Sequence, residues 1–231
     1  MFPPGPNEQI EHHQLHELLF LFAYGDARGS VSKPWHLGPG LVAAILIELA
    51  GIDALAWLGN RPRIQAVSPF LPPSRTAMLR TAAVQQVLAA LGGSPRAETA
   101  SHWMRALGAE VHEHTTAALS EAGTVRRGER KSLTGRKEVV VQHSSIPAHL
   151  QARVLLMAKR MREVDTRSAA LCGLIVTLRL EGMIKTDSRL RLASELRDVS
   201  LQHAPHSQEI LAELRGVLYP GHLRGGQIPL G

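Results

Sequence analysis

The residues most able to do chemistry in this sequence form a basic cluster near its middle. Within residues 126–137, six side chains are positively charged and one is acidic. The six basic residues are Arg126, Arg127, Arg130, Lys131, Arg136 and Lys137. Guanidinium and ammonium groups bind phosphate oxygens well. The cluster therefore indicates contact with the phosphates of nucleic acid or of anionic lipid.

No catalytic or metal-binding pattern accompanies this cluster. The sequence has no phosphate loop of the Walker type, no GxGxxG after a predicted strand and no GxSxG elbow. His12 and His16 have the spacing of two ligands on one helical face, and His112 and His114 flank an acid, but neither pair has a third ligand nearby. Cys172, the single cysteine, lies in an apolar helical run and is interpreted as a buried structural thiol. We therefore expect no metal, no cofactor and no enzymatic activity.

The longest apolar run, residues 41–52, contains one acid, Glu48. A run of twelve residues is too short to span a bilayer, and the N-terminus lacks the basic-then-apolar order of a signal peptide. We therefore expect a cytoplasmic protein whose membrane contact is peripheral. Because a buried carboxyl needs a partner, Glu48 is expected to make a structural hydrogen bond or ion pair.

The positive overall charge has two explanations, which are selection for binding phosphates and a bias in coding composition. Lys and Arg number 26 against 20 acids, and the sequence pI is about 10.1. Of the 26, 21 are Arg and 5 are Lys, and Ala is abundant, as a GC-rich coding bias would produce without selection for binding. Such a bias explains the local cluster at 126–137 less well, so this cluster is the better indication of function.

Hydrophobic periodicity predicts a mainly α protein with two short β-hairpins. The first hairpin is expected to pair 54–58 with 64–67, and the second to pair 125–127 with 138–142 across an exposed loop, 128–137. The expected helices are 15–24, 41–50, 76–91, 95–107, 109–122, 147–163, 166–182, 187–201 and 206–218. They are expected to form a single helical domain over 15–218, a central bundle wrapped by further helices, between a flexible N-terminus, 1–14, and a flexible tail, 219–231.

Local signals set several of these boundaries. Ser94, Asp165 and Asp187 are expected to cap helices, and Gly123 is expected to end one. Trp35 falls in the stretch KPWHLGPG, which its prolines and glycines predict to be a loop. A tryptophan in such a loop belongs either to the core or to a lipid interface. The other two tryptophans, Trp57 and Trp103, are expected in the core.

The order of the motifs resembles the Golgi phosphoprotein 3 family. The motifs in question are LHELLFLFAYGDARGSV, a Trp-bearing loop, GLVAAILIELAG, then ASHWMRALG and TTAALSEAGTV leading into a hairpin, and DTRSAALCGLIVTL. The resemblance runs over about residues 15–218 and looks most like a bacterial member. It implies a helical domain that docks peripherally on membranes. In eukaryotic members it implies recognition of phosphatidylinositol 4-phosphate and of the tails of Golgi enzymes.

The resemblance also points to headgroup-binding positions in this chain. Trp35 matches the tryptophan that precedes the family's core helix, whereas three basic positions of the family fall on Val42, Ala109 and His112. One position of four is kept, so the resemblance implies an anionic lipid or phosphoinositide ligand without saying which one. The family hairpin corresponds to the basic cluster, whose apolar tip residues are here reduced to Leu133.

The function predicted from these residues is that of a non-enzymatic adaptor at a membrane surface. It would bind anionic headgroups through the basic hairpin and Trp35. One alternative is a scaffold that binds other proteins or itself as a homo-oligomer. The other is a winged-helix protein that binds nucleic acid. Against the latter, the helix before the hairpin, AEVHEHTTAALSEAG, carries three acids and no Lys or Arg, which would repel phosphates.

Overall fold

The computed structural model describes residues 10, 12–25, 34–58, 61–64, 79, 81–94, 98–131, 137–142 and 145–220. In this part of the chain it has eight α-helices: α2 (Leu15–Ala23), α3 (Pro34–Ala50), α5 (Ala82–Gly93), α6 (Ala100–Glu121), α7 (Ser145–Ala158), α8 (Thr166–Thr177), α9 (Arg189–His203) and α10 (Gln208–Leu218). Two antiparallel hairpins join them, β1 (Leu55–Leu58) with β2 (Arg61–Ile64) and β3 (Val125–Lys131) with β4 (Lys137–Val141). Single 3₁₀ turns lie at Glu181–Met183 and Pro205–Ser207. The predicted mainly α fold is confirmed.

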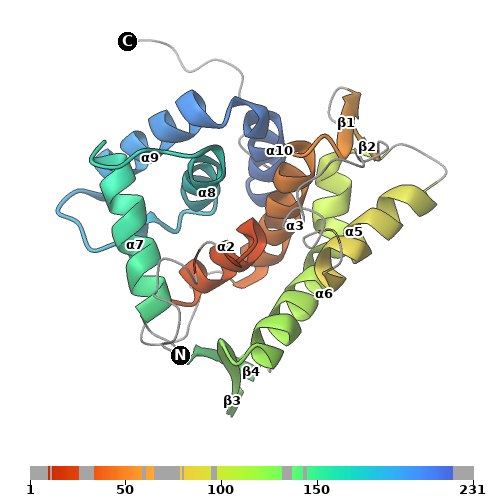
Figure 1. Ribbon diagram of the computed structural model, residues 1–231. Helices are drawn as coiled ribbons and strands as arrows, with labels where there is room; N and C mark the ends of the chain where they lie inside the picture. The colour runs from red at the N-terminus through yellow and green to blue at the C-terminus, as the bar shows by residue number, and fades with distance from the viewer. Residues whose placement is uncertain are drawn as a thin grey trace.

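The core is built around α2 and α3. Figure 1 shows these two helices in the middle of the molecule, with α5 and α6 on one side and α7, α8 and α9 on the other. Every residue of α2 from Leu19 to Ala23 has no exposed surface, and every residue of α3 from Leu41 to Ile47 is at most 2 % exposed. A helix that is apolar all round is stable only when other helices cover it. The predicted central bundle with further helices around it is thus the arrangement found.

Helix α3 begins earlier than expected, and the loop predicted for Trp35 is wrong. Pro34 starts the helix, Trp35 lies in its first turn, and Pro39 lies inside it. Pro34 removes no helical hydrogen bond, because the first four N–H groups have no partner within the helix, whereas Pro39, the sixth residue, removes one. Tight packing explains why the helix forms here: a Cβ added to Gly38 would lie 2.5 Å from the carbonyl oxygen of Gly108 on α6.

The predicted break between helices at 95–107 and 109–122 is also wrong. Helix α6 runs without interruption through Gly108. This glycine is needed where α3 crosses, since a Cβ on it would lie 2.9 Å from the backbone nitrogen of Pro39. The helix is capped by Thr99, whose side chain accepts a hydrogen bond from the backbone N–H of His102, and not by Ser94, which follows α5.

Smaller corrections concern strand register and caps. Strand β2 is 61–64, so that Trp57 pairs with Pro62 and the predicted partner strand at 64–67 is shifted. Proline is tolerated there because each strand of a two-stranded ribbon is an edge strand. Ser188, not Asp187, caps α9, whereas Asp165 caps α8 as predicted. Residues 65–67, 76–78 and 95–97 lie outside the described residues, as do 1–9, 11 and 221–231 of the predicted flexible ends.

Candidate functional site

The basic hairpin is anchored to the end of α6. Gly123 follows that helix with φ of 70°, a conformation that glycine adopts without strain. The backbone N–H of Thr124 then donates to the carbonyl of Leu119, and that of Gln142 donates to the carbonyl of Thr124, both at 2.9 Å. Val125 and Val139 are 2 % and 5 % exposed. Buried valines and these hydrogen bonds therefore hold the base of the hairpin against the bundle.

The paired strands reach further than predicted. Lys131 is the last residue of β3 and Lys137 the first of β4, and their Cα atoms are register partners. The register shifts between Arg127 and Lys131, which marks an irregularity in the ribbon. Half of the predicted ten-residue loop, namely 128–131 and 137, is therefore strand, and 132–136 lie outside the described residues.

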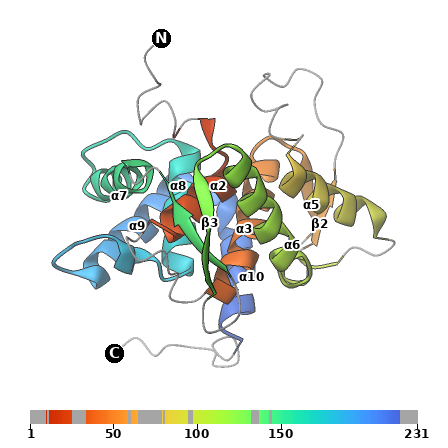
Figure 2. The same ribbon diagram turned by 90° about the horizontal axis from the view of Figure 1, so that it is seen from below.

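Figure 1 shows the hairpin at one end of the molecule, beyond the C-terminal end of α6, and Figure 2 shows it from below, projecting toward the viewer. Among the predicted site residues, Arg126 is exposed at its base, opposite exposed Val140. Arg127, Arg130 and Lys131 lie on β3 and Lys137 on β4. Arg136 lies outside the described residues. The strand pairing thus places these basic positions along one ribbon.

The positions taken from the family's headgroup pocket do not make a basic site. Val42 has no exposed surface and Ala109 is exposed on α6. The Nε2 atom of His112 shares a hydrogen bond of 3.0 Å with the hydroxyl of Tyr24, and the His112 ring packs beside Phe20. His112 thus joins α2 to α6. Of Trp35 the structure describes the backbone, at the start of α3.

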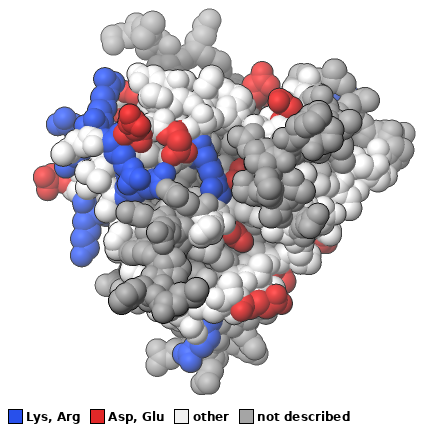
Figure 3. Space-filling view, in the orientation of Figure 1, with Lys and Arg blue, Asp and Glu red and all other residues white. Residues whose placement is uncertain are grey.

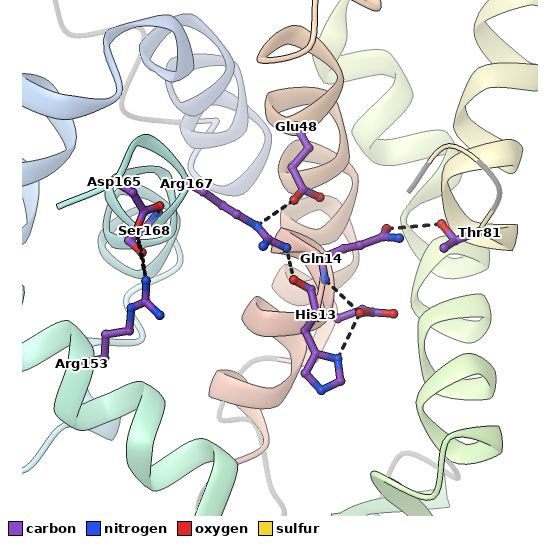
Figure 4. A network of polar contacts seen from close by, with 9 residues as sticks. His13, Gln14, Glu48, Thr81, Arg153, Asp165, Arg167 and Ser168 are labelled. Carbon is purple, nitrogen blue, oxygen red and sulfur yellow. Dashed lines mark hydrogen bonds and ion pairs between the residues drawn. The ribbon is translucent and has the colours of Figure 1, made fainter. Parts of the chain in front are cut away.

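A polar network at the other side of α2 explains Glu48. Figure 4 shows Arg167 reaching from α8 toward α3, where its Nε lies 3.0 Å from Oε1 of Glu48. The same guanidinium donates to the backbone carbonyl of His13, just before α2. Glu17 then accepts from His13 Nδ1 at 3.1 Å and from the Gln14 N–H at 2.9 Å. The predicted ion pair of Glu48 is confirmed, and it connects three helices.

A second ion pair nearby is more exposed. Arg153 on α7 donates to Asp165 Oδ2 and to Ser168 Oγ, both at 3.0 Å. Asp165 is also the cap of α8, through a 2.9 Å bond from the Ser168 N–H. The side chain of Asp165 is 53 % exposed, compared with 10 % for Glu48. Because Glu48 is the more buried of the two carboxylates, removing its partner Arg167 should destabilise the fold more than removing Arg153.

Burial shifts several ionisation equilibria in this network. Desolvation raises the pKa of Glu48 to about 7, against the opposing attraction of Arg167. Desolvation, aided by Arg167, lowers the pKa of His16 to about 4. For Glu17, burial acts to raise the pKa, but the hydrogen bond from His13 and the neighbouring His16 outweigh it, and the pKa is lowered. These groups fasten α2, α3 and α8 together, which gives them a structural role.

The other sequence candidates are also structural. Cys172 is fully buried in α8, as predicted, and desolvation raises the pKa of its thiol to about 12. His16 is 1 % exposed, while His12 is exposed, so this pair does not face one common surface. No group of three His, Cys, Asp or Glu side chains suited to a metal occurs among the residues described here. Likewise, no helix in the described ranges is long and apolar enough to cross a membrane.

Comparison with known protein families gives a match over most of the chain. The family described as Golgi phosphoprotein 3 (GPP34) matches residues 15–218. This range begins at the first residue of α2 and ends at the last residue of α10. No curated protein matches the sequence. The match thus covers both hairpins and all eight helices described above.

Proposed function

Because this chain belongs to the Golgi phosphoprotein 3 family, we propose that it is a non-enzymatic adaptor that docks peripherally on the cytoplasmic face of membranes. The β3–β4 hairpin is its proposed contact with the anionic headgroups of phospholipids or phosphoinositides. Trp35 enters this proposal through the family resemblance alone.

The observation that carries the proposal is the pairing of β3 with β4, which brings the basic positions Arg126, Arg127, Arg130, Lys131 and Lys137 onto one ribbon. Phosphates on a lipid surface can meet these positive charges together. The hairpin projects from the bundle, so that a flat surface can reach it (Figure 1). Such a ribbon suits a planar array of lipid phosphates. DNA is the less suitable ligand, because the helix before the hairpin, α6, carries exposed Glu110, Glu113 and Glu121, which would repel its phosphates.

Specificity for phosphatidylinositol 4-phosphate is not part of the proposal. Of the four family headgroup positions, the three that are basic in the family carry Val42, Ala109 and His112, and the histidine is engaged with Tyr24. Charge density is therefore the proposed basis of recognition. Each basic residue near an anionic leaflet contributes about 1 kcal/mol. Six basic residues less one acid give roughly 5 kcal/mol, a dissociation constant of about 0.1–1 mM.

The test is binding to vesicles that contain phosphatidylserine. Replacing Lys131 and Lys137 together by alanine is expected to weaken binding about 30-fold, because two contributions of about 1 kcal/mol are lost. The melting temperature should stay nearly the same, because the buried base of the hairpin, with Val125 and Val139, is unchanged. Binding by the unchanged protein should also weaken steeply with salt, as exposed charges are screened beyond about 10 Å at 0.1 M. Vesicle co-sedimentation and a thermal melt measure the two effects.

A matched control removes the same charge elsewhere. Lys159 and Lys185 are both exposed and lie outside the hairpin, so Lys159→Ala/Lys185→Ala should bind nearly as the unchanged protein does. Equal losses for the two double variants would show that net charge, not the hairpin, governs binding. Tighter, sequence-dependent binding to duplex DNA would favour the winged-helix alternative. Binding to neither vesicles nor DNA would leave a protein scaffold or homo-oligomer.

A further inference from the structure

A second basic site, remote from the hairpin, lies between α8, α9 and α10. A cavity of about 270 Å³, which we call the α8–α10 pocket, opens between these helices. Figure 1 shows α9 and α10 at the end of the molecule away from the hairpin. The residues that matter for its chemistry are Arg179, Arg197, Ser200, Gln208, Arg215 and Tyr219. A flat membrane surface in contact with the hairpin would therefore not also contact this pocket.

Three arginines line the α8–α10 pocket, each from a different element. Arg179 follows α8, Arg197 lies on α9 and Arg215 on α10, and no acid is among the lining residues. Within the part of the chain that the structure describes, none of the three side chains makes an ion pair or a hydrogen bond with the protein. All three arginines are exposed, so water can serve their N–H donors in the absence of a ligand. Here their N–H donors remain available to a ligand.

The arginines also act on one another. Burial and the neighbouring charge of Arg197 lower the pKa of Arg215. Arg179 is held at the rim by the ring of Tyr219, whose centroid lies 4.5 Å from its guanidinium carbon. Glu181 acts electrostatically on Tyr219, and within the described residues none of the three arginines makes an ion pair with an acid. An anion is thus the missing partner that would turn this repulsion into attraction.

The interior of the pocket adds shape and an apolar wall. Its floor is tight: a Cβ added to Gly173 would lie 2.4 Å from Ser200 Oγ and 2.5 Å from a methyl carbon of Leu211. The amide nitrogen of Gln208 donates to Ser200 Oγ at 3.1 Å, which fixes α9 against the start of α10. Leu211 and the Tyr219 ring provide apolar surface. Three cations beside such a surface suit a small organic anion better than a bare inorganic ion.

Phosphate fits the cation set better than carboxylate does. A phosphate monoester carries up to two negative charges and three terminal oxygens, whereas a carboxylate has one charge and two oxygens. Guanidinium forks on α9, on α10 and just after α8 can each take a separate oxygen. We propose that the α8–α10 pocket binds the phosphate group of a small organic phosphate monoester, with Arg197 and Arg215 on the phosphate, Arg179 at its edge and the Tyr219 ring against the organic part.

The test titrates the full chain with phenyl phosphate and follows heat and melting temperature. Binding in the micromolar to millimolar range is expected, with an increase in melting temperature. Arg197→Ala and Arg215→Ala should each weaken it about tenfold or more, because each removes charged hydrogen bonds to the phosphate. Without phenyl phosphate, both variants should melt at or above the temperature of the unchanged protein, since one repelling charge is gone.

The matched control is Arg191→Ala, an exposed arginine of α9 that pairs with Glu195 outside the pocket. It should bind phenyl phosphate unchanged, as should the hairpin variant Lys131→Ala/Lys137→Ala, which separates this proposal from the proposed function. Vesicles containing phosphatidic acid identify the source: loss of vesicle binding in Arg197→Ala/Arg215→Ala assigns the phosphate to a lipid, and retention assigns it to a soluble molecule. Benzoate bound as tightly as phenyl phosphate, or no binding by the unchanged protein, would overturn the proposal.

Discussion

Replacing Arg167 by leucine is expected to lower the free energy of unfolding by about 3 kcal/mol at about pH 8. The change leaves the carboxylate of Glu48, 10 % exposed, without its cation in the centre of the bundle. It also leaves the backbone carbonyl of His13 without its donor. We take the lower end of the range for a broken buried pair because the side chain of Arg167 is 34 % exposed and solvent screens part of its charge. Chemical denaturation followed by circular dichroism measures the loss.

The loss of unfolding free energy in Arg167→Leu should be smaller at about pH 5 than at about pH 8. The direction of this pH dependence follows from the carboxyl of Glu48. Its pKa is raised to about 7 in the folded protein from the ordinary 4.5, so the folded state holds the proton more tightly. The stability from this group is complete below the ordinary pKa and is lost as pH rises through 7. Without Arg167 the pKa rises further, so the variant loses more at high pH than at low pH.

His16 acts in the opposite direction in the unchanged protein. Its pKa is lowered to about 4 from 6.5, so its contribution to stability is present above the ordinary value and is lost as pH falls through 4. Arg167 is one of the charges that lower it, together with His13, whereas Glu17 raises it. Removing Arg167 therefore reduces the His16 penalty at low pH. Both effects make the Arg167→Leu loss larger at pH 8 than at pH 5.

Two variants separate a charge effect from lost packing. Arg153→Leu removes the partner of Asp165, which is 53 % exposed, and should lose only about 1 kcal/mol or less. Arg167→Leu/Glu48→Leu removes both charges and should recover most of the stability, because no carboxylate is left buried alone. The explanation fails if the double variant is no more stable than Arg167→Leu, or if the loss is the same at both pH values.

Replacing Gly38 by alanine is expected to lower the free energy of unfolding by about 3 kcal/mol, at the upper end for overpacking. The new Cβ would lie 2.5 Å from the carbonyl oxygen of Gly108 and 2.8 Å from its carbonyl carbon. Both contacts are with backbone, so no side chain can rotate away and α3 and α6 must separate. The core on both sides of α3 would then lose contact with α6. Thermal and chemical denaturation measure the effect.

The matched control is Gly93→Ala, at the last residue of α5. A Cβ there meets no atom within 4 Å, so alanine should be neutral or stabilise the helix by up to about 1 kcal/mol. If Gly38→Ala lost no more unfolding free energy than Gly93→Ala, the crossing of α3 and α6 would tolerate separation of the two helices, contrary to this expectation. Because α6 carries the β3–β4 hairpin, Gly38→Ala is also expected to disturb the hairpin's position, whereas Gly93→Ala should not.

Several features follow from the sequence alone because they depend on neighbours in the chain. The all-apolar pattern of 41–50 demanded a buried helix, and α3 is buried there. Asp165 caps α8 and Gly123 follows α6 through contacts within a few residues. The requirement that Glu48 have a partner also follows from its apolar surroundings. The family resemblance, which rested on the order of such motifs, is confirmed over 15–218.

Other features were decided only by tertiary contacts. Local preferences of Gly and Pro amount to about 1–3 kcal/mol, and packing over a whole helix exceeds them. For this reason Trp35 and Pro39 lie in α3, and α6 continues through Gly108. The pairing of Lys131 with Lys137 required the strand register, which residue types alone do not determine.

The partners of the charged groups were the least accessible to sequence reasoning. Arg167 meets Glu48 because α8 packs against α3, although long stretches of chain separate them. Arg179, Arg197 and Arg215 are unremarkable in a sequence with many arginines, and only the packing of α8, α9 and α10 brings them to one cavity. Composition determines how many charges a chain carries, whereas the energy of each charge depends on its burial and on the distance to the next one, and the tertiary fold sets both.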